Sequence, residues 1–253
     1  MAHARSTSFA LRQAARFRVQ ALLAFLIILI FGGAVSAQQT ELRKYDAYAG
    51  FVDLNSPALG LNQTGFHTQG GVNLKSWLVM GGDYSVSAGQ TVLKPDLLPA
   101  ATQQQLGEVI LALIQQGIIP PTYQLLLPAN VFTQSFAAGP QFSYRHFRRV
   151  TLFARPSLGA FRIGATPRPR DPVATQISQI LVPSGHKVDW TGFYGVGWGG
   201  EYQVTRLAGI RAQMDLVHNH PFNDILANGF WTVRSSIGLN FHFGHNILAP
   251  RAK

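Results

Sequence analysis

The sequence predicts an all-β fold, namely an eight-stranded antiparallel transmembrane β-barrel with a short helix in its second extracellular loop. Charged residues make up only 13% of the 253 residues, whereas soluble domains usually carry about 25%. Beyond the N-terminal segment, no apolar run reaches the roughly 20 residues that a membrane-spanning helix needs. Apolar and polar residues instead alternate with period two, in a chain with 25 glycines and 11% aromatic residues, as expected of strands that face lipid on one side.

Residues 1–37 have the order of a secretory signal peptide. Four arginines precede an unbroken apolar stretch from Ala21 to Ile30, and the small residues of Val35-Ser36-Ala37 follow it. This basic, apolar and small-residue order predicts cleavage after Ala37. We therefore divide the chain into a signal peptide, 1–37, and an outer-membrane β-barrel domain, 38–253, with a loop insertion at 90–130.

Charge and cysteine content exclude several classes of function. The formal net charge of +10 falls to +6 when the four arginines of residues 1–37 are set aside. The remaining basic residues form no stripe or run, so we expect no nucleic-acid partner. The chain has no cysteine, which excludes disulfides, thiolate catalysis and cysteine-based zinc sites. Export without cysteines is compatible with a Gram-negative cell envelope.

Eight runs of alternation have the length that a tilted strand needs to cross a bilayer, about 9–11 residues. The last run is the clearest, because Trp231, Ile237 and Phe241 share one face while Arg234 and Asn240 lie on the other. In a membrane barrel the apolar face points to lipid and the polar face points into the lumen. The expected strands are 43–54, 64–75, 77–89, 131–146, 149–163, 190–203, 206–219 and 230–243.

The connections between these strands alternate in length. The short ones lie near residues 75–76, 147–148 and 204–206, and the long ones span about 55–63, 90–130, 165–189 and 220–229. Short periplasmic turns and long extracellular loops are typical of outer-membrane barrels. With the N-terminus in the periplasm, all four long loops are expected to face outward.

Two of the long loops contain features of their own. In 90–130, Thr102 and Gln105 resemble a capping box, and apolar residues recur at helical spacing, which predicts an amphipathic helix over 102–116. We expect its apolar stripe to pack over the barrel mouth or neighbouring loops, or to contact a partner. The loop 165–189 begins with three prolines and two arginines, which predicts a stiff basic stretch. It is either a plain surface loop or a contact for lipopolysaccharide phosphates.

Charged residues on the lumen face form the main polar group of the sequence. An eight-stranded barrel is just wide enough for its side chains to fill, and buried ions must be paired. We therefore expect a structural charge network that fills the lumen, with a gate or narrow conduction path as the alternative. Its members are Lys75, Asp83, Arg145, Arg155, Glu201, Arg211, Asp215 and Arg234.

The chain resembles the outer-membrane β-barrel domain family, with the eight-stranded architecture of the OmpA-like barrels, over roughly residues 43–244. The motifs that carry this resemblance are Tyr48-Ala49-Gly50-Phe51, the glycine-rich segment 195–202, the segment 210–215 and the closing segment 236–244. The resemblance implies that the last strand, through Phe241 and Phe243, is read by the barrel insertion machinery. Ten residues follow Phe243, a departure from the family pattern, and we expect no cell-wall-binding domain after it.

No chemistry is expected from this chain. A lipid A-modifying barrel would need a serine, a histidine and an acid together on the lipid-facing side. The candidates are His218, Ser235 and Asp224, but the expected pairing places His218 beside Trp231 and Ser235 near Met214. His218 and His220 are too few for a closed zinc site, so no metal and no cofactor is expected.

The sequence therefore predicts an outer-membrane β-barrel protein with a structural or surface-interaction role, and not an enzyme. A narrow channel for small solutes or ions is the alternative, and a lipid A-modifying enzyme ranks below both. The expected partners are outer-membrane lipids, the insertion machinery and a surface ligand that binds through loops 90–130 and 165–189.

Overall fold

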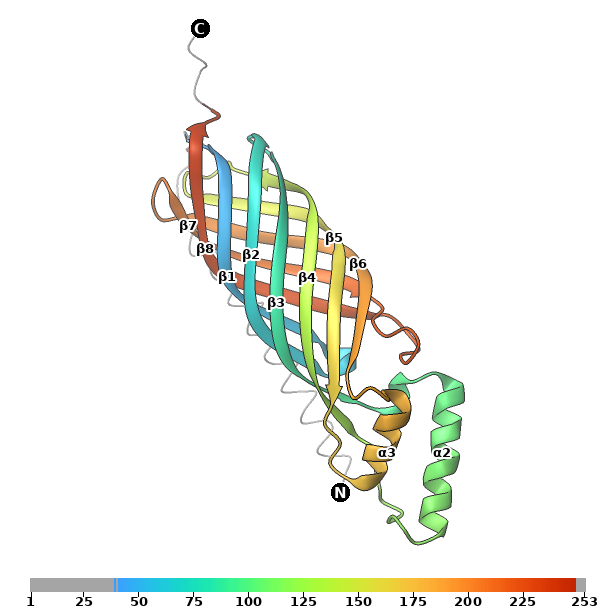
Figure 1. The fold of residues 1–253 in the computed structure, drawn as a ribbon. Coiled ribbons are helices and arrows are strands. Elements are labelled where there is room, and N and C mark those ends of the chain that lie inside the picture. Colours follow the sequence, from blue (N-terminus) through green and yellow to red (C-terminus); the bar gives the residue numbers. More distant parts are fainter. Residues whose placement is uncertain (1–38, 40, 249–253) are drawn as a thin grey trace.

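The strands close into a single antiparallel barrel in which each strand pairs with its neighbours in sequence and β1 pairs with β8 (Figure 1). The computed structural model describes Gln39 and residues 41–248, so the predicted signal peptide, 1–37, lies outside the described residues. All eight predicted strands are present, and most extend further than expected. They are β1 (Arg43–Ser56), β2 (Leu61–Lys75), β3 (Leu78–Leu93), β4 (Leu127–Tyr144), β5 (Val150–Pro167), β6 (Lys187–Gln203), β7 (Ala208–Asn219) and β8 (Phe230–Asn246).

The two ends of the barrel differ, and we call them the turn end and the loop end. At the turn end, residues 76–77, 145–149 and 204–207 connect the strands. At the loop end, residues 94–126, 168–186 and 220–229 connect them, whereas β1 and β2 are joined only by the 3-10 turn η1 (Pro57–Leu59) and Gly60. The long first loop predicted at 55–63 was therefore wrong. Gly60 has φ 58° and closes η1 through its N–H to the Pro57 carbonyl, a left-handed conformation that suits glycine.

The predicted helix in the second long loop is present as α2 (Ala100–Gln115), which follows the 3-10 turn η2 (Pro95–Leu97). The predicted capping box is wrong, because α2 begins two residues earlier, with Pro99 at the N-cap and no side-chain cap. Gln103 instead donates from Nε2 to the Leu98 carbonyl at 2.8 Å. Leu98, just before the helix, is buried, and Thr102 falls inside the first turn.

A second helix, α3 (Pro172–Leu181), lies in the loop that was predicted to be irregular. Asp171 caps it, since its carboxylate accepts a hydrogen bond from the Ala174 N–H at 2.8 Å and another from the Tyr123 hydroxyl at 2.9 Å. Proline at the first helical position also favours this start. The basic segment before it thus ends in a folded helix beside the barrel mouth.

The helices α2 and α3 lie side by side beyond the loop end (Figure 1). Leu106 and Ile110 of α2 pack against a buried cluster that includes Ile177 of α3 and Leu127 of β4. Val109 and Leu111 remain more than half exposed. Among the described residues, no helix is both long enough and apolar enough to cross a membrane.

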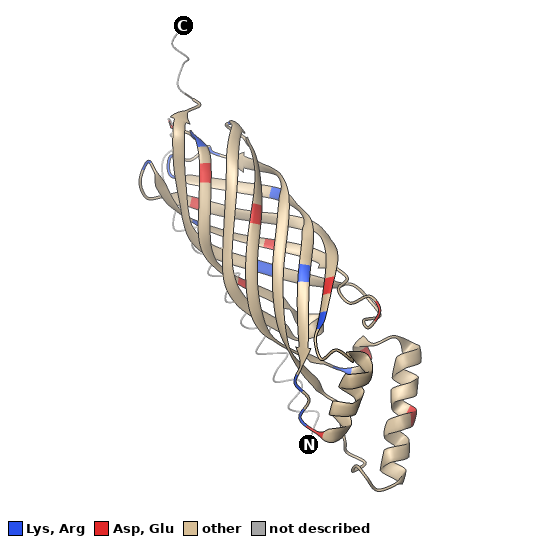
Figure 2. Cartoon of the chain, viewed as in Figure 1, with Lys and Arg blue, Asp and Glu red and all other residues tan. Residues whose placement is uncertain are grey.

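The outside of the barrel is apolar and the middle of its interior is polar, the reverse of a soluble β-sandwich. Large side chains such as Phe51, Ile237 and Leu239 are more than half exposed, and charged positions are sparse along the wall (Figure 2). Aromatic pairs lie near the turn end, where Trp77 stacks on Phe142 with ring centroids 6.1 Å apart. Closed strand pairing leaves no open sheet edge, and a strand edge with unpaired backbone groups would not be tolerated in hydrocarbon. This chain is an outer-membrane-type β-barrel with lipid-facing walls.

Candidate functional site in the barrel interior

The interior of the barrel has two layers of different chemistry. Every second residue of each strand points inward, so eight strands deliver a dense set of side chains to a narrow space. From the middle to the turn end most of these side chains are charged or polar, whereas a cluster of apolar ones lies near the loop end. The polar layer was expected from the alternation of the strands, whereas the apolar layer was not.

The polar layer centres on an ionic cluster of two arginines and two aspartates, which we call the central cluster. Its members are Asp83 of β3, Arg155 of β5, Asp215 of β7 and Arg234 of β8, and each is at most 8% exposed. Side chains from four strands around the barrel wall therefore meet at one point in the lumen. Two guanidinium groups face two carboxylates, so the formal charges of the cluster balance.

Arg234 makes the densest contacts in the central cluster. Its Nη1 donates to Asp83 Oδ1 at 2.9 Å, and its Nη2 donates to Asp215 Oδ2 at 2.8 Å. Nη1 also donates to the Ser135 hydroxyl at 2.8 Å. Arg155 binds the same two carboxylates, with 3.0 Å from Nη1 to Asp83 Oδ2 and 3.0 Å from Nη2 to Asp215 Oδ2. Charge-assisted bonds of this forked kind are stronger and more directional than neutral ones.

A second ionic group lies nearer the turn end. The Arg211 guanidinium donates from Nη2 to Glu201 Oε2 at 2.9 Å, and its Nη1 donates to Gln69 Oε1 at 3.1 Å. Asn240 donates to the same Glu201 oxygen at 2.9 Å, and His242 contacts the other carboxylate oxygen. The face of the guanidinium lies 5.2 Å from the Phe153 ring centroid, which adds a cation–π contact.

The structure places six of the eight predicted lumen charges inside the barrel, divided between these two groups. Arg145 lies at the turn end, where it donates to the Asn73 side chain at 2.9 Å and to the Ser76 carbonyl at 3.1 Å. The prediction for Lys75 was wrong, because its side chain is exposed and its Nζ lies 5.5 Å from the Trp77 ring centroid. β2 ends at Lys75, and its pairing with β3 shifts between Asn73 and Lys75, so the alternation no longer directs this side chain inward.

Several buried interior residues were missed in the sequence. His67 is fully buried, with Nε2 3.6 Å from Asp83 Oδ1 and Nδ1 3.0 Å from the Ser236 hydroxyl. Asp46 is buried beside Asn73. Both lie at inward-facing positions of their strands, so the alternation that predicted the other charges could also have predicted these two.

Gly197 of β6 makes room for the central cluster. A Cβ atom built on Gly197 would overlap Asp215 Oδ1 and would lie 3.1 Å from Arg155 Nε. A strand with larger residues here would displace the carboxylate that holds both arginines. Glycine at position 197 is therefore a packing requirement of the central cluster.

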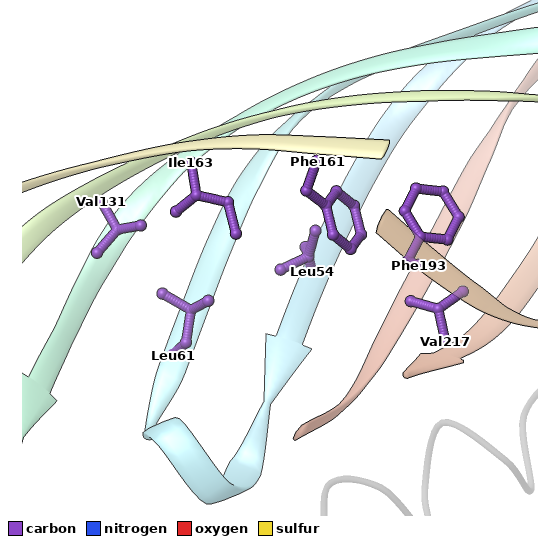
Figure 3. Close-up of a cluster of buried hydrophobic side chains, with 7 residues drawn as sticks. All are labelled: Leu54, Leu61, Val131, Phe161, Ile163, Phe193 and Val217. Carbon is purple, nitrogen blue, oxygen red and sulfur yellow. The ribbon is translucent and has the colours of Figure 1, made fainter. Parts of the chain in front are cut away.

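The apolar layer fills the lumen between the central cluster and the loop end, and we call it the apolar plug. Side chains from six strands point toward one another across the barrel (Figure 3). Phe161 and Phe193 stack with ring centroids 4.3 Å apart, and the Arg234 guanidinium lies 6.0 Å from the Phe193 ring centroid. The plug consists of Leu54, Leu61, Val131, Phe161, Ile163, Phe193 and Val217.

Beside the plug, on its loop-end side, lies a partly open cavity of about 120 Å³. Its walls come from the loop ends of the strands, from the end of α3 and from residues 221–226. Leu181 and Val182 close it on the side of α3, and Phe222 and Leu226 close it on the side of the last loop. The barrel mouth is thus covered by folded chain.

The candidate catalytic residues on the lipid-facing side do not assemble. His218 pairs with Trp231 and Ser235 pairs with Met214 across β7 and β8, as the sequence predicted. Asp224 instead forms an ion pair with Lys187. Within the described part of the chain, no group of three or more histidine or acidic side chains could hold a metal ion. This geometry supports no reaction at His218.

Neither a protein-family model nor a curated protein matches the chain. Among solved structures, it is similar to Neisserial surface protein A, NspA, at 12% identity and a TM-score of 0.46, over 79% of this chain and 96% of that one. It is similar to Ail, the attachment invasion locus protein of Yersinia pestis in complex with the heparin analogue sucrose octasulfate, at 13% identity and a TM-score of 0.45, over 80% and 99%. It is also similar to the N-terminal β-barrel domain of Pseudomonas aeruginosa OprF, at 10% identity and a TM-score of 0.37, over 79% and 98%.

Proposed function

We propose that this chain is a non-conducting outer-membrane barrel, in which a filled lumen makes a rigid support for the folded surface at the loop end. The observation that carries the proposal is the central cluster. It ties β3, β5, β7 and β8 together across the middle of the lumen through buried, balanced charges.

The two layers oppose ion passage for different reasons. An ion that crosses the central cluster must separate guanidinium from carboxylate groups that have no other way to compensate their buried charge. An ion that crosses the apolar plug must lose its hydration among aliphatic and aromatic side chains, which offer it no ligands. The two barriers lie in series along one narrow lumen, so we expect neither a steady nor a large conductance.

The loop end is the part of the molecule that we propose to be functional on the cell surface. α2 presents Val109 and Leu111 to solvent, and Arg168 and Arg170 lie in the segment before α3. Exposed apolar residues and guanidinium groups are common in contact surfaces. The proposed partners are outer-membrane lipids around the wall and a surface ligand of residues 90–130 and 165–189.

Single-channel recording in planar bilayers tests the closed lumen. The purified protein, checked for a closed barrel by heat-modifiable gel mobility, should show no steady conductance. A triple variant, Leu54→Ser, Phe161→Ser and Phe193→Ser, removes much of the plug but retains the central cluster, and it should also remain closed. Large and steady conductance from the wild type would contradict the proposal and favour the narrow channel.

The surface role is tested separately. Deletion of residues 100–116 should leave barrel closure unchanged, because those residues lie outside the strands, and it should lower the binding of the protein to whole-cell or matrix surfaces. Unchanged binding would remove α2 from the proposed contact surface.

A further inference from the structure

The cavity above the apolar plug has the properties of a binding site, and nothing in the proposed function accounts for it. Its volume of about 120 Å³ is close to that of an engineered apolar cavity of 150 Å³ that stays dry and binds benzene. Side chains in protein interiors normally interdigitate and leave few voids larger than a water molecule. This partly open space at the barrel mouth is large enough for a small apolar occupant.

The cavity lining is predominantly aliphatic and aromatic, and most of its polar side chains are already paired. Thr91 donates from its hydroxyl to the Leu59 carbonyl at 2.6 Å, and Asn219 donates to the Thr232 hydroxyl at 2.9 Å. Lys187 is paired with Asp224. Among the lining residues, the buried Thr133 hydroxyl has no partner in the described chain. Such a lining has little to offer a charged molecule or a group of ordered waters, each of which needs several polar partners.

The cover over the cavity is made of short, separately folded pieces. α3 contributes its last turn, and residues 221–226 contribute Phe222 and Leu226. Both are loop insertions outside the strand pairing of the barrel. The Lys187–Asp224 ion pair joins the start of β6 to the last loop, and Lys187 is part of the cavity lining.

We propose that this mouth cavity binds an uncharged apolar group, of about the size of a benzene ring or a short alkyl chain, between the apolar plug and α3. Such a group could come from a free small molecule or from the end of a lipid acyl chain, since the lining would recognise the same chemistry in both. The proposal concerns the mouth and is independent of whether the ionic layer blocks ions.

The test uses the full mature barrel in lipid nanodiscs, with methyl NMR signals of Leu54, Val131 and Ile163 as reporters. Benzene should cause saturable shifts of these signals, whereas benzylammonium, of similar shape but charged, should cause none. Dihexanoyl phosphatidylcholine forms the second arm. Saturable shifts with benzene alone would support a free small molecule, and saturable shifts with both would support an acyl-chain end as well.

Two variants separate the cavity from other apolar sites. Ala165→Phe places a ring in the cavity, because Ala165 of β5 lines it, and should weaken benzene binding at least tenfold. Ala154→Phe in the same strand points to lipid and should bind as the wild type does. If Ala165→Phe does not form a closed barrel, the smaller change Ala129→Leu at another lining position replaces it. No saturable shift with either probe, or wild-type affinity in a folded cavity-filling variant, would overturn the proposal.

Discussion

Replacement of Arg234 by methionine should be the most damaging single change in the barrel interior. Arg234 is 1% exposed and donates five hydrogen bonds, four of them to Asp83 and Asp215 and one to Ser135. Methionine leaves two buried carboxylates with only Arg155 as a counter-charge. Breaking a buried ion pair by removing one partner usually costs about 3–5 kcal/mol, so we expect a loss of that size in the free energy of unfolding.

The assay is urea unfolding of the barrel in vesicles, followed by tryptophan fluorescence, with gel mobility to confirm closure. Arg206→Met serves as a control, because Arg206 forms an exposed ion pair with Glu41 at 3.3 Å and such pairs contribute at most about 1 kcal/mol. The double variant Asp83→Asn with Arg234→Met restores charge balance around Arg155 and Asp215. Its cost should therefore be smaller than the sum of the two single costs by about 0.5–3 kcal/mol. A loss below about 1 kcal/mol for Arg234→Met, or strict additivity in the double variant, would refute the reasoning.

Three further predictions follow from particular contacts. Gly197→Ala should lower the free energy of unfolding by about 1–3 kcal/mol, because the new Cβ overlaps Asp215 Oδ1. Gly192→Ala in the same strand is the control and should be neutral, since the only atom near its new Cβ is the Gly159 carbonyl oxygen at 3.9 Å. Equal costs of the two variants in urea unfolding would contradict this prediction. Burial and the adjacent Asp171 carboxylate raise the pKa of Tyr123 to about 12, above the usual value of about 10, so the Tyr123–Asp171 contact should hold below about pH 10 and be lost as the pH rises through 12. Ultraviolet titration of wild type against Tyr123→Phe should show one tyrosine that ionises near pH 12, and ionisation near pH 10 would count against the contact. Phe243→Ala should lower the fraction of newly made protein that reaches the heat-modifiable form if the last strand is read during insertion, and Phe142→Ala, also lipid-facing near the turn end, is the control; equal fractions would argue against this role.

The barrel could be predicted because its determinants are local in the chain. Alternation with period two in β3, β5, β7 and β8 marks both the strand and its inward face, so the inward positions of Asp83, Arg155, Asp215 and Arg234 followed from parity alone. The pairing of His218 with Trp231 was predicted by counting across the loop 220–229, and the register of β7 and β8 confirms it. The same reasoning wrongly placed Lys75 in the lumen, because β2 ends at this residue and its register with β3 shifts there.

The loop end was harder to predict, because its structure depends on contacts between distant segments. α3 was missed, since its ten residues follow prolines and arginines that indicate an irregular loop. Its N-cap, Asp171, gains a second partner from Tyr123, which lies 48 residues earlier in the chain. The helix α2 also begins at Ala100, directly after Pro99 and the buried Leu98, and not at the local Thr102 pattern.

The sequence by itself determined the strands, their inward faces and the presence of ionic side chains in the lumen, because backbone alternation and the need to shield charge from lipid act within each strand. Only the tertiary structure decided which charges meet. Arg234 is shared by Asp83 and Asp215 because closure between β1 and β8 brings opposite walls within the reach of one side chain. Closure also gathers Leu54, Phe161 and Phe193 from three strands into one plug. The sequence places each of these residues on an inward face, but which of them contact one another depends on the closed barrel.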